Sequence, residues 1–205
     1  GTYEAGTPPG AQPRTAAISG EVSGTTHFVA VDGTGDIASM TSTVEGPFGS
    51  QLIANGYVLN NELTDFTFAP EKDGAPVANR VEPGKRPLSS MSPTIVYGPD
   101  GKPVFAAGAA GGKTIIMQVA KILIAHLDWG LSAQEAIAAP NIYFAGDAVL
   151  VEPGTALAAM QSQLAGFGHT VVTGRMSSKA NAAERTANGW QGAADPRSEG
   201  VALGE

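Results

Sequence analysis

Residues 25–44 read TTHFVAVDGTGDIASMTSTV, two strand-like runs joined by a tight turn. The runs His27–Val31 and Ile37–Val44 are rich in β-branched and apolar residues, and the DGTGD segment between them is typical of a hairpin turn. If the turn centres on its middle threonine, the register places Thr25 opposite Thr43. The pattern therefore predicts a β-hairpin with two threonines facing each other at its open end.

Thr25 follows Ser23-Gly24, at the point where linker-like composition changes to a strand. A glycine before a threonine at such a border indicates a site where a precursor cleaves itself. Cleavage makes Thr25 a new N-terminus whose free α-amine activates its own hydroxyl, so the nucleophile needs no histidine or cysteine. While the Gly24–Thr25 bond is intact, the Thr25 nitrogen is an amide and cannot act as a base.

The composition of the 205-residue chain is that of a folded protein, with 42% apolar and 15% charged residues. The net charge of −7 and the lack of a basic cluster argue against nucleic acid as a partner. Without cysteines, disulfides, thiolate metal sites and cysteine nucleophiles are excluded. No apolar run is long enough to span a membrane, so we expect no membrane insertion by this chain. Residues 1–24 have the composition of a flexible segment, and residues 25–205 that of one domain.

Three acidic residues are candidates for binding an ammonium group. Glu62 and Asp65 lie three apart in NNELTDF, near enough to share one side of a turn. Glu45 shares the face of Thr43 if its strand runs that far. Together they can form an acidic pocket, although solvated loop carboxylates give the same pattern.

Two further motifs contain groups that can donate hydrogen bonds to an anion. Ser89 and Ser90, in KRPLSSMSP, can bind a carboxylate or merely complete a turn. Gly111-Gly112 leads from a strand into an apolar helix predicted over residues 114–127. Unpaired N–H groups at a helix N-terminus are suited to stabilising an oxyanion, although an ordinary glycine-rich turn looks the same.

Several more elements complete the predicted order along the chain. Ser132 and Glu135 form a capping-box pattern at the start of a short helix that Pro140 ends. The other predicted elements are a hairpin of 94–97 and 104–107, strands at 141–144, 149–151 and 169–172, and a helix at 155–164. Hairpins on both sides of a buried helix pair indicate a layered sandwich of α and β elements.

The motifs occur in a fixed order: TTHF at residues 25–28, LNNELTDF at 59–66, KRPLSSMSP at 85–93, GG at 111–112 and DPRS at 195–198. From Thr25 to near Ser198, this combination resembles the small subunit of γ-glutamyltranspeptidases, which are N-terminal-nucleophile hydrolases. Residues 1–24 resemble the tail of the large subunit before the processing site. The resemblance implies an α+β fold, a layered αββα sandwich of which this chain supplies about half.

The resemblance also implies a role for each candidate residue. Thr25 is the nucleophile that forms a γ-glutamyl acyl-enzyme, and Thr43 hydrogen-bonds it. Gly111 and Gly112 form the oxyanion hole. The residues implied to bind the glutamyl head group are Glu45, Glu62 and Asp65 for its α-ammonium and Ser89 and Ser90 for its α-carboxylate.

The chain departs from the family pattern in two ways. The family loop usually reads Gly-Ser-Pro-Gly-Gly, where this chain has GAAGG at residues 108–112. The α-carboxylate in the family also contacts an arginine of the large subunit, which this chain lacks. We therefore expect a working oxyanion hole but only part of the substrate pocket.

As a whole, the resemblance implies hydrolysis or transfer of γ-glutamyl groups from glutathione-like amides to water or an amine, with no cofactor and no metal. It implies a large subunit from the same precursor as partner and a periplasmic or secreted location. Two alternatives stay open: a cephalosporin or glutaryl acylase on the same framework, and an unprocessed or non-catalytic relative that binds γ-glutamyl compounds. The acidic and serine motifs favour a γ-glutamyl head group, and Thr25 with Thr43 favours an enzyme.

Overall fold

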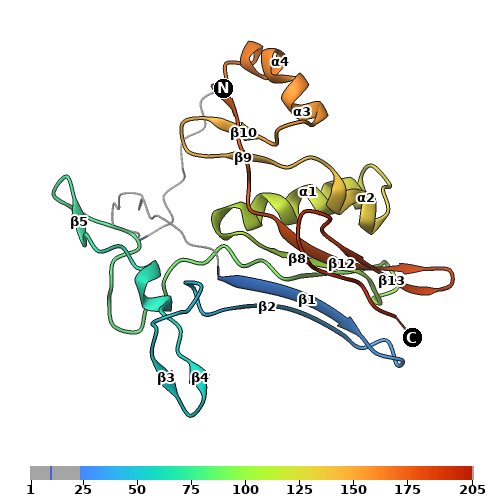
Figure 1. The fold of residues 1–205 in the computed structure, drawn as a ribbon, viewed down its shortest axis with the longest axis horizontal. Helices are drawn as coiled ribbons and strands as arrows, with labels where there is room; N and C mark the ends of the chain where they lie inside the picture. Colours follow the sequence, from blue (N-terminus) through green and yellow to red (C-terminus); the bar gives the residue numbers. More distant parts are fainter. Residues whose placement is uncertain (1–9, 11–23, 205) are drawn as a thin grey trace.

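The computed structural model describes residue 10 and residues 24–204, so the predicted flexible segment 1–24 lies almost wholly outside the described residues. At the centre of the described part is a four-stranded antiparallel sheet in the order β13-β12-β8-β7 (Figure 1). Its strands are β7 (Thr94–Tyr97), β8 (Pro103–Ala110), β12 (Lys179–Thr186) and β13 (Gly189–Ala194).

The sheet is covered by different layers on its two faces. Helices α1 (Ile115–Leu127) and α2 (Ala133–Ala138) pack on one face, and the hairpin of β1 (Thr25–Val31) and β2 (Ile37–Thr43) lies on the other (Figure 1). The last six residues of β8 are buried because this central strand is covered on both faces. Most of them are alanine or glycine, whose small size lets both layers approach closely.

The β1–β2 hairpin has the predicted register. Thr25 pairs with Thr43, and Val31 pairs with Ile37 beside the turn. The Asp32 carboxylate closes the turn by accepting hydrogen bonds from the N–H and hydroxyl of Thr34 and from the N–H of Asp36. The predictions for the hairpin and its register are confirmed.

Helix α1 buries one stripe rather than its whole circumference. The buried residues are Ile115, Gln118, Val119, Ile122 and Ala125, at the spacing expected for a helix resting on a sheet. Ile116, Ile124 and Leu127 point away and are exposed, so the prediction that this helix is buried is wrong for its outer side. No helix within residues 24–204 has the length and apolarity needed to cross a membrane.

The predicted capping box is present, with both reciprocal bonds of Ser132 and Glu135. After helix α2 the chain forms a small second sheet. Its strands are β9 (Ile142–Phe144), β10 (Val149–Val151) and β11 (Val171–Thr173), in the order β11-β10-β9. The helix predicted at 155–164 is instead two short helices, α3 (Ala156–Ala159) and α4 (Gln161–Gly166), because Met160 leaves the helical conformation between them.

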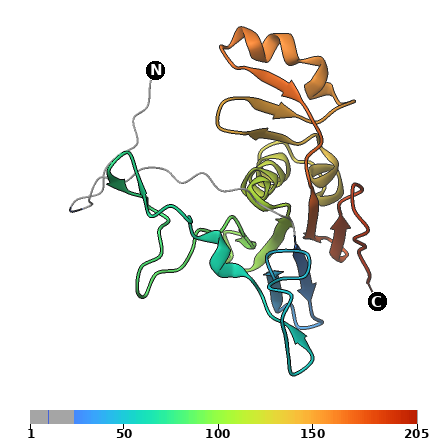
Figure 2. The same ribbon diagram turned by 60° about the vertical axis from the view of Figure 1, so that its left-hand side comes forward.

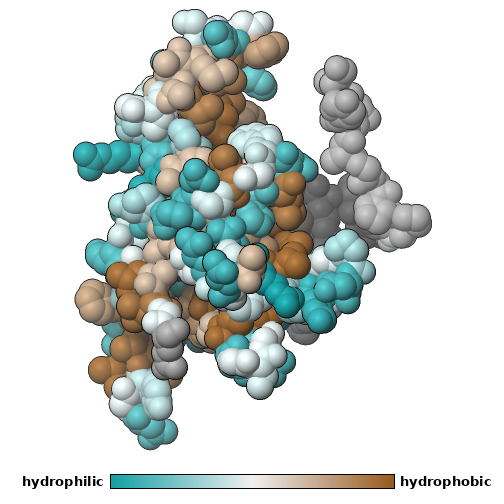
Figure 3. Space-filling view, turned by 90° about the vertical axis from the view of Figure 1, so that its right-hand side faces the viewer, coloured by the Kyte–Doolittle hydropathy of each residue, from teal (hydrophilic) through white to brown (hydrophobic). Residues whose placement is uncertain are grey.

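Residues 44–93 contain little regular structure. They form two hairpins of two-residue strands, β3 (Ile53–Ala54) with β4 (Tyr57–Val58) and β5 (Glu71–Lys72) with β6 (Ala75–Pro76), and the 3₁₀ helix η1 (Glu62–Asp65). Figure 2 shows that this segment extends away from the central sheet. Figure 3 shows hydrophobic surface just above the lowest tip of the molecule, at the height of β3 and β4 in Figure 1.

Candidate active site

The open end of the β1–β2 hairpin brings the predicted nucleophile to its threonine partner. The Thr25 hydroxyl donates a hydrogen bond to Thr43 Oγ1 at 3.1 Å. Thr43 Oγ1 also accepts the Glu45 N–H at 2.8 Å. The Thr43 hydroxyl therefore links the predicted nucleophile Thr25 to the backbone of Glu45.

Strand β2 ends at Thr43, so Glu45 does not reach its position by continuing the strand. Its backbone is left-handed, with a φ of 72°, and this turns the chain toward η1. Asn61 holds the two segments together, because its Oδ1 accepts the Gly46 N–H at 2.8 Å and its own N–H donates to the Val44 carbonyl at 3.2 Å.

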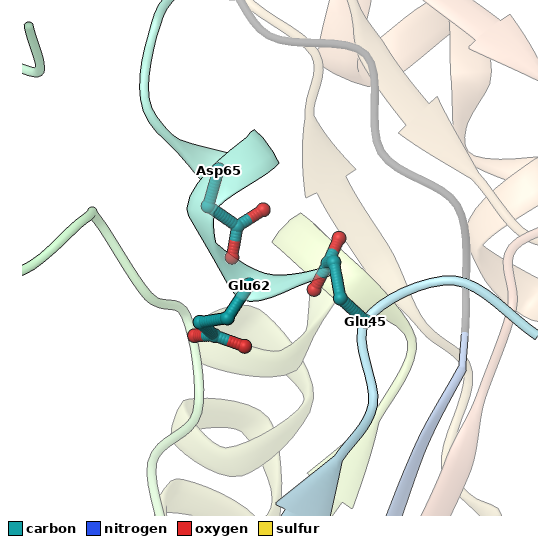
Figure 4. A group of neighbouring side chains, drawn as sticks. All are labelled: Glu45, Glu62 and Asp65. Carbon is teal, nitrogen blue, oxygen red and sulfur yellow. The ribbon is translucent and has the colours of Figure 1, made fainter. Parts of the chain in front are cut away.

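The three predicted acidic residues meet as a result. Oxygens of Glu45, Glu62 and Asp65 lie within 4.8 Å of one another, with Glu62 and Asp65 on η1 and Glu45 on the loop after β2 (Figure 4). Burial, and secondly the charge of Asp65, raise the pKa of Glu62 above its ordinary value, although Arg86 opposes the shift. Such a group favours a positive ligand, which can be an organic ammonium or a hard metal ion.

The loop with the predicted serines is tied to the acidic helix by Asn79. The buried Asn79 side chain donates to the Asp65 carbonyl through Nδ2 and accepts the Leu88 N–H at 2.9 Å through Oδ1. Ser89 and Ser90 follow directly. Ser89 Oγ accepts the Met91 N–H at 3.3 Å. Asn79 therefore sets the separation of the acidic and serine groups.

One pocket collects seven of the nine predicted site residues. Its lining consists of Thr25, Thr43, Glu45, Glu62, Asp65, Leu88, Ser89, Ser90, Met91 and Ile115. Gly111 and Gly112 do not line this pocket, but they lie shortly before Ile115 in the chain, and Ile115 does line it. A larger groove of about 1270 Å³ lies along β1, β12, β13 and residues 198–204. Of the predicted site residues it contains only Thr25, so we place the site in the smaller pocket.

His27 lies two residues beyond Thr25 on β1 but is not among the residues that line the pocket. Its Nδ1 lies 2.8 Å from Thr41 Oγ1, and burial lowers the pKa of His27 to about 4, so the ring is neutral at neutral pH. The ring packs on Gly108, where a Cβ would lie 2.2 Å from His27 Cε1. A glycine at 108 is required for the hairpin to rest on the sheet.

Gly24, before the predicted cleavage site, also has no room for a side chain. A Cβ there would lie 2.3 Å from the Glu45 carbonyl oxygen and 2.6 Å from that of Gly46. The backbone beside the Gly24–Thr25 bond therefore packs directly on the loop that carries Glu45.

Sequence reasoning missed the residues that hold the site together. Asn61, Asn79 and Gln118 all have buried or half-buried side chains that bond backbone groups of other segments. Asn61 lies within the NNELTDF motif, but the motif alone gives it no role. For Gln118 the one signal in the sequence is a single glutamine on an otherwise apolar stretch of helix.

Comparison of sequences finds relatives among glutathione hydrolases. The chain is 44% identical over 121 residues to the glutathione hydrolase proenzyme of Bacillus subtilis strain 168, covering 58% of this chain and 20% of that protein. It is 39% identical over 142 residues to the glutathione hydrolase proenzyme of Escherichia coli K12, covering 63% and 24%. The alignments thus span at most a quarter of either relative's length.

Comparison of structures agrees with the α+β fold class predicted from the sequence. A Helicobacter pylori γ-glutamyltranspeptidase T380A mutant gives a TM-score of 0.74 at 32% identity, covering 84% of this chain and 100% of that one. A cephalosporin acylase from Bacillus halodurans gives 0.71 at 26% identity, covering 85% of this chain and 33% of that one. The family model for gamma-glutamyltranspeptidase matches residues 5–205, and the chain therefore belongs to the gamma-glutamyltranspeptidase family.

Proposed function

We propose that this chain supplies the nucleophile and the head-group site of an enzyme that hydrolyses or transfers γ-glutamyl groups. The observation that carries the proposal is the single pocket in which the bonded pair Thr25 and Thr43 meets three carboxylates and two serines. In this assignment residues 25–205 are the small-subunit catalytic domain and residues 1–24 the end of the large subunit.

The first reaction is self-cleavage. The Thr25 hydroxyl attacks the Gly24 carbonyl, the Gly24–Thr25 amide bond breaks, and the Thr25 nitrogen takes up a proton as Gly24 becomes esterified to Thr25 Oγ1. Water then hydrolyses the ester, which leaves a carboxylate on Gly24 and a free α-amine beside the restored hydroxyl. The hydrogen bond from Thr25 to Thr43 supports this role, because it holds the hydroxyl at the end of the strand.

Turnover uses the new α-amine as the base. It takes the hydroxyl proton while Thr25 Oγ1 attacks the γ-carbonyl of the substrate, and the negative charge on the carbonyl oxygen is stabilised by the N–H groups of Gly111 and Gly112. The leaving amine takes the proton as the amide bond breaks. Water or an acceptor amine then attacks the γ-glutamyl ester and frees Thr25.

The head group of the substrate is an α-amino acid in this proposal. Glu45, Glu62 and Asp65 bind its ammonium. Burial, and secondly the charge of Asp65, raise the pKa of Glu62, and an ammonium bound there would favour the ionised carboxylate. The hydroxyls of Ser89 and Ser90 bind its carboxylate. Glutathione and similar γ-glutamyl amides carry both groups.

The structural likeness to a cephalosporin acylase keeps a second candidate, an acylase for glutaryl amides. A glutaryl group has no α-ammonium, so it would offer the three carboxylates no positive charge to bind. The acidic cluster therefore favours the γ-glutamyl substrate.

Further parts of the proposal concern partner and location. The large subunit of the same precursor would complete the sandwich and the pocket, which agrees with the fraction of the relatives that this chain spans. A periplasmic or secreted location follows from the family resemblance.

The test uses the precursor with its upstream half. Intact mass should show a fragment that begins at Thr25, and the processed protein should turn over γ-glutamyl anilide far faster than glutaryl anilide. Thr25→Ala should abolish both cleavage and turnover, whereas Thr26→Ala, on the exposed side of β1, should leave both intact. Unchanged γ-glutamyl turnover in Thr25→Ala would refute the nucleophile assignment, and preference for the glutaryl substrate would favour the acylase.

A further inference from the structure

Gln118 is a polar side chain buried in an apolar layer. It is 3% exposed on the face of α1 that rests on the sheet, between Ile115 and Ile122. Burying an amide is unfavourable unless its groups are hydrogen-bonded. Each end of this amide has partners, and these partners lie around the glycine loop of residues 110–114.

The orientation of the amide is set by its neighbours. Nε2 lies 3.2 Å from the Ala110 carbonyl oxygen, 3.2 Å from that of Ser177 and 2.8 Å from Thr114 Oγ1. Carbonyl oxygens only accept, so the NH₂ group must face them. Oε1 then faces the other way, where it accepts from Ser178 Oγ at 3.0 Å.

A buried carboxylate lies behind Ser178. Asp195 is 1% exposed. The single proton of the Ser178 hydroxyl is shared between Asp195 Oδ2 and Gln118 Oε1. Burial alone would raise the pKa of Asp195, but the hydrogen bonds of Ser178 and Arg197 outweigh it and lower the pKa below its ordinary value. The chain Asp195–Ser178–Gln118 thus links the end of β13 to the glycine loop.

The loop backbone adopts conformations that residues other than glycine rarely adopt. Gly111 and Gly112 both have positive φ, 137° and 62°, and no proline occurs between Pro103 and Pro140. Within the described part of the chain, neither the Gly111 nor the Gly112 N–H donates a hydrogen bond. The directions of these two N–H groups must be set through other atoms.

Peptide planarity supplies that control. The Ala110 carbonyl and the Gly111 N–H belong to one rigid plane and point in opposite directions, as do the Gly111 carbonyl and the Gly112 N–H. Gln118 holds the first carbonyl, and Thr114 Oγ1 donates to the second at 2.8 Å. Fixing both carbonyls fixes both N–H directions.

We propose that Gln118 and Thr114 are positioning residues that aim the N–H groups of Gly111 and Gly112 at the oxyanion of the reaction, with Ser178 and Asp195 holding Gln118 in place. This inference rests on the proposed function. The side chains of this inference touch neither the substrate nor Thr25. They set the geometry of the oxyanion hole in a loop that lacks the rigid proline of the usual family pattern.

The test measures kcat and KM for γ-glutamyl anilide in the precursor processed with its upstream half, with rates expressed per processed Thr25. Gln118→Met keeps the size but removes the donor, and Thr114→Val removes the hydroxyl. In each, kcat and kcat/KM should fall together by about 10- to 100-fold while KM stays within about twofold, because a transition-state interaction is lost. Thr114→Ser, which keeps the hydroxyl, should recover most of the rate.

Gln134 provides the matched control. Its amide also bonds a backbone carbonyl, that of Ala194 at 3.1 Å, but it lies on α2 away from the glycine loop. Gln134→Met should retain wild-type kcat and KM.

The milder Ser178→Ala variant covers the case in which Gln118→Met does not fold. It should lower kcat by about three- to tenfold at unchanged KM, because Gln118 loses the bond to Oε1.

The positioning role would be overturned, and the proposed function left standing, if Gln118→Met and Thr114→Val both kept wild-type kcat. If Gln118→Met does not fold, wild-type kcat in both Ser178→Ala and Thr114→Val would have the same meaning. A rise in KM equal to the loss of kcat/KM would also overturn the positioning role. If the processed wild type does not turn over γ-glutamyl anilide, the proposed function fails and the positioning role fails with it.

Discussion

Two regions of this chain differ in how completely they are packed. The sheet–helix unit, formed by β7, β8, β12, β13, α1 and α2, contains the whole core cluster, whose members run from Phe105 to Ala193. The loop region, residues 44–93, buries only Phe66 and Val77 among its hydrophobic side chains. It exposes Phe48, Leu52, Ile53, Tyr57, Val58, Leu59, Leu63, Phe68 and Val81.

This difference separates two parts of the candidate site. The glycines that would stabilise the oxyanion lie in the sheet–helix unit, whose geometry the chain sets by itself. The acids and serines that would bind the substrate head group lie in or beside the loop region, whose apolar surface this chain leaves uncovered. Extended exposed apolar surface is typical of a binding interface, which suits the large subunit in the proposed function.

The largest expected difference between the regions concerns their arginines. Arg197 donates to the carbonyls of Ala138 and Ala139 and pairs with Glu152 and Asp195. Arg197→Met removes the positive charge that pairs with the buried Asp195 and the half-buried Glu152, so the free energy of unfolding measured in urea should fall by about 3–5 kcal/mol. Arg80→Met, in the loop region, removes a more exposed pair with Glu82 and should change stability far less. Equal losses would erase the distinction between the regions.

Removing apolar volume tests the same contrast. Ile122 is 0% exposed on α1 and Ile53 is 72% exposed on β3. Ile122→Ala leaves a cavity and should lower the free energy of unfolding by about 2–5 kcal/mol. Ile53→Ala should stay within about 0.5 kcal/mol. A large loss in Ile53→Ala would mean that the loop region is better packed than its exposure indicates.

The contact between hairpin and sheet provides a third test. Gly108→Ala places a methyl group against the His27 ring and should cost about 1–3 kcal/mol. Adding His27→Ala makes room, so the double variant should lose less than the sum of the two single changes. Gly33→Ala is the matched control, since open space surrounds that glycine. Additive losses would show that the ring and the glycine do not interact.

Asn79 tests whether the loop region acts on binding alone. Asn79→Ala removes the link between the Asp65 carbonyl and the Leu88 N–H. In the processed enzyme, KM for γ-glutamyl anilide should rise by about tenfold with kcat changed by less than about threefold, because the head-group site loosens while the glycine loop does not. Asn188→Ala, in the exposed turn between β12 and β13, should change neither constant. A fall in kcat alone would contradict the division of roles.

The smallest expected effect is the pH dependence of KM. In the proposed function, an ionised Glu62 would attract the substrate ammonium and a protonated one would not. As the pH is lowered, KM should increase by a few-fold when Glu62 becomes protonated. Because the pKa of Glu62 is raised, this increase should begin at a higher pH than for an ordinary glutamate, whose pKa is about 4.3. Glu62→Gln should raise KM and flatten this part of the profile. A profile identical to that of the wild type would remove Glu62 from the head-group site.

Local patterns predicted much of the fold. The β1–β2 and β7–β8 hairpins, helix α1 and the Ser132–Glu135 capping box are all present as expected. The hairpin of β12 and β13 was missed, although β12 is a central strand of the sheet. Its sequence, KANAAERT, is rich in alanine and charge, which are unfavourable in strands in general. Alanine suits this strand only because the sheet is covered on both sides.

The sequence by itself determined that Thr25 faces Thr43, because strand side chains alternate and the turn around Thr34 sets the register. It also brought Glu62 and Asp65 onto one short turn. Only the tertiary structure decided that Glu45 joins them, through a left-handed backbone and the bonds of Asn61. Likewise, it decided that Gln118 rather than Ile116 faces the sheet. The reason is that a buried amide is stable only where hydrogen-bonding partners surround it. Ser178, whose hydroxyl donates to Gln118 Oε1, lies 60 residues away along the chain.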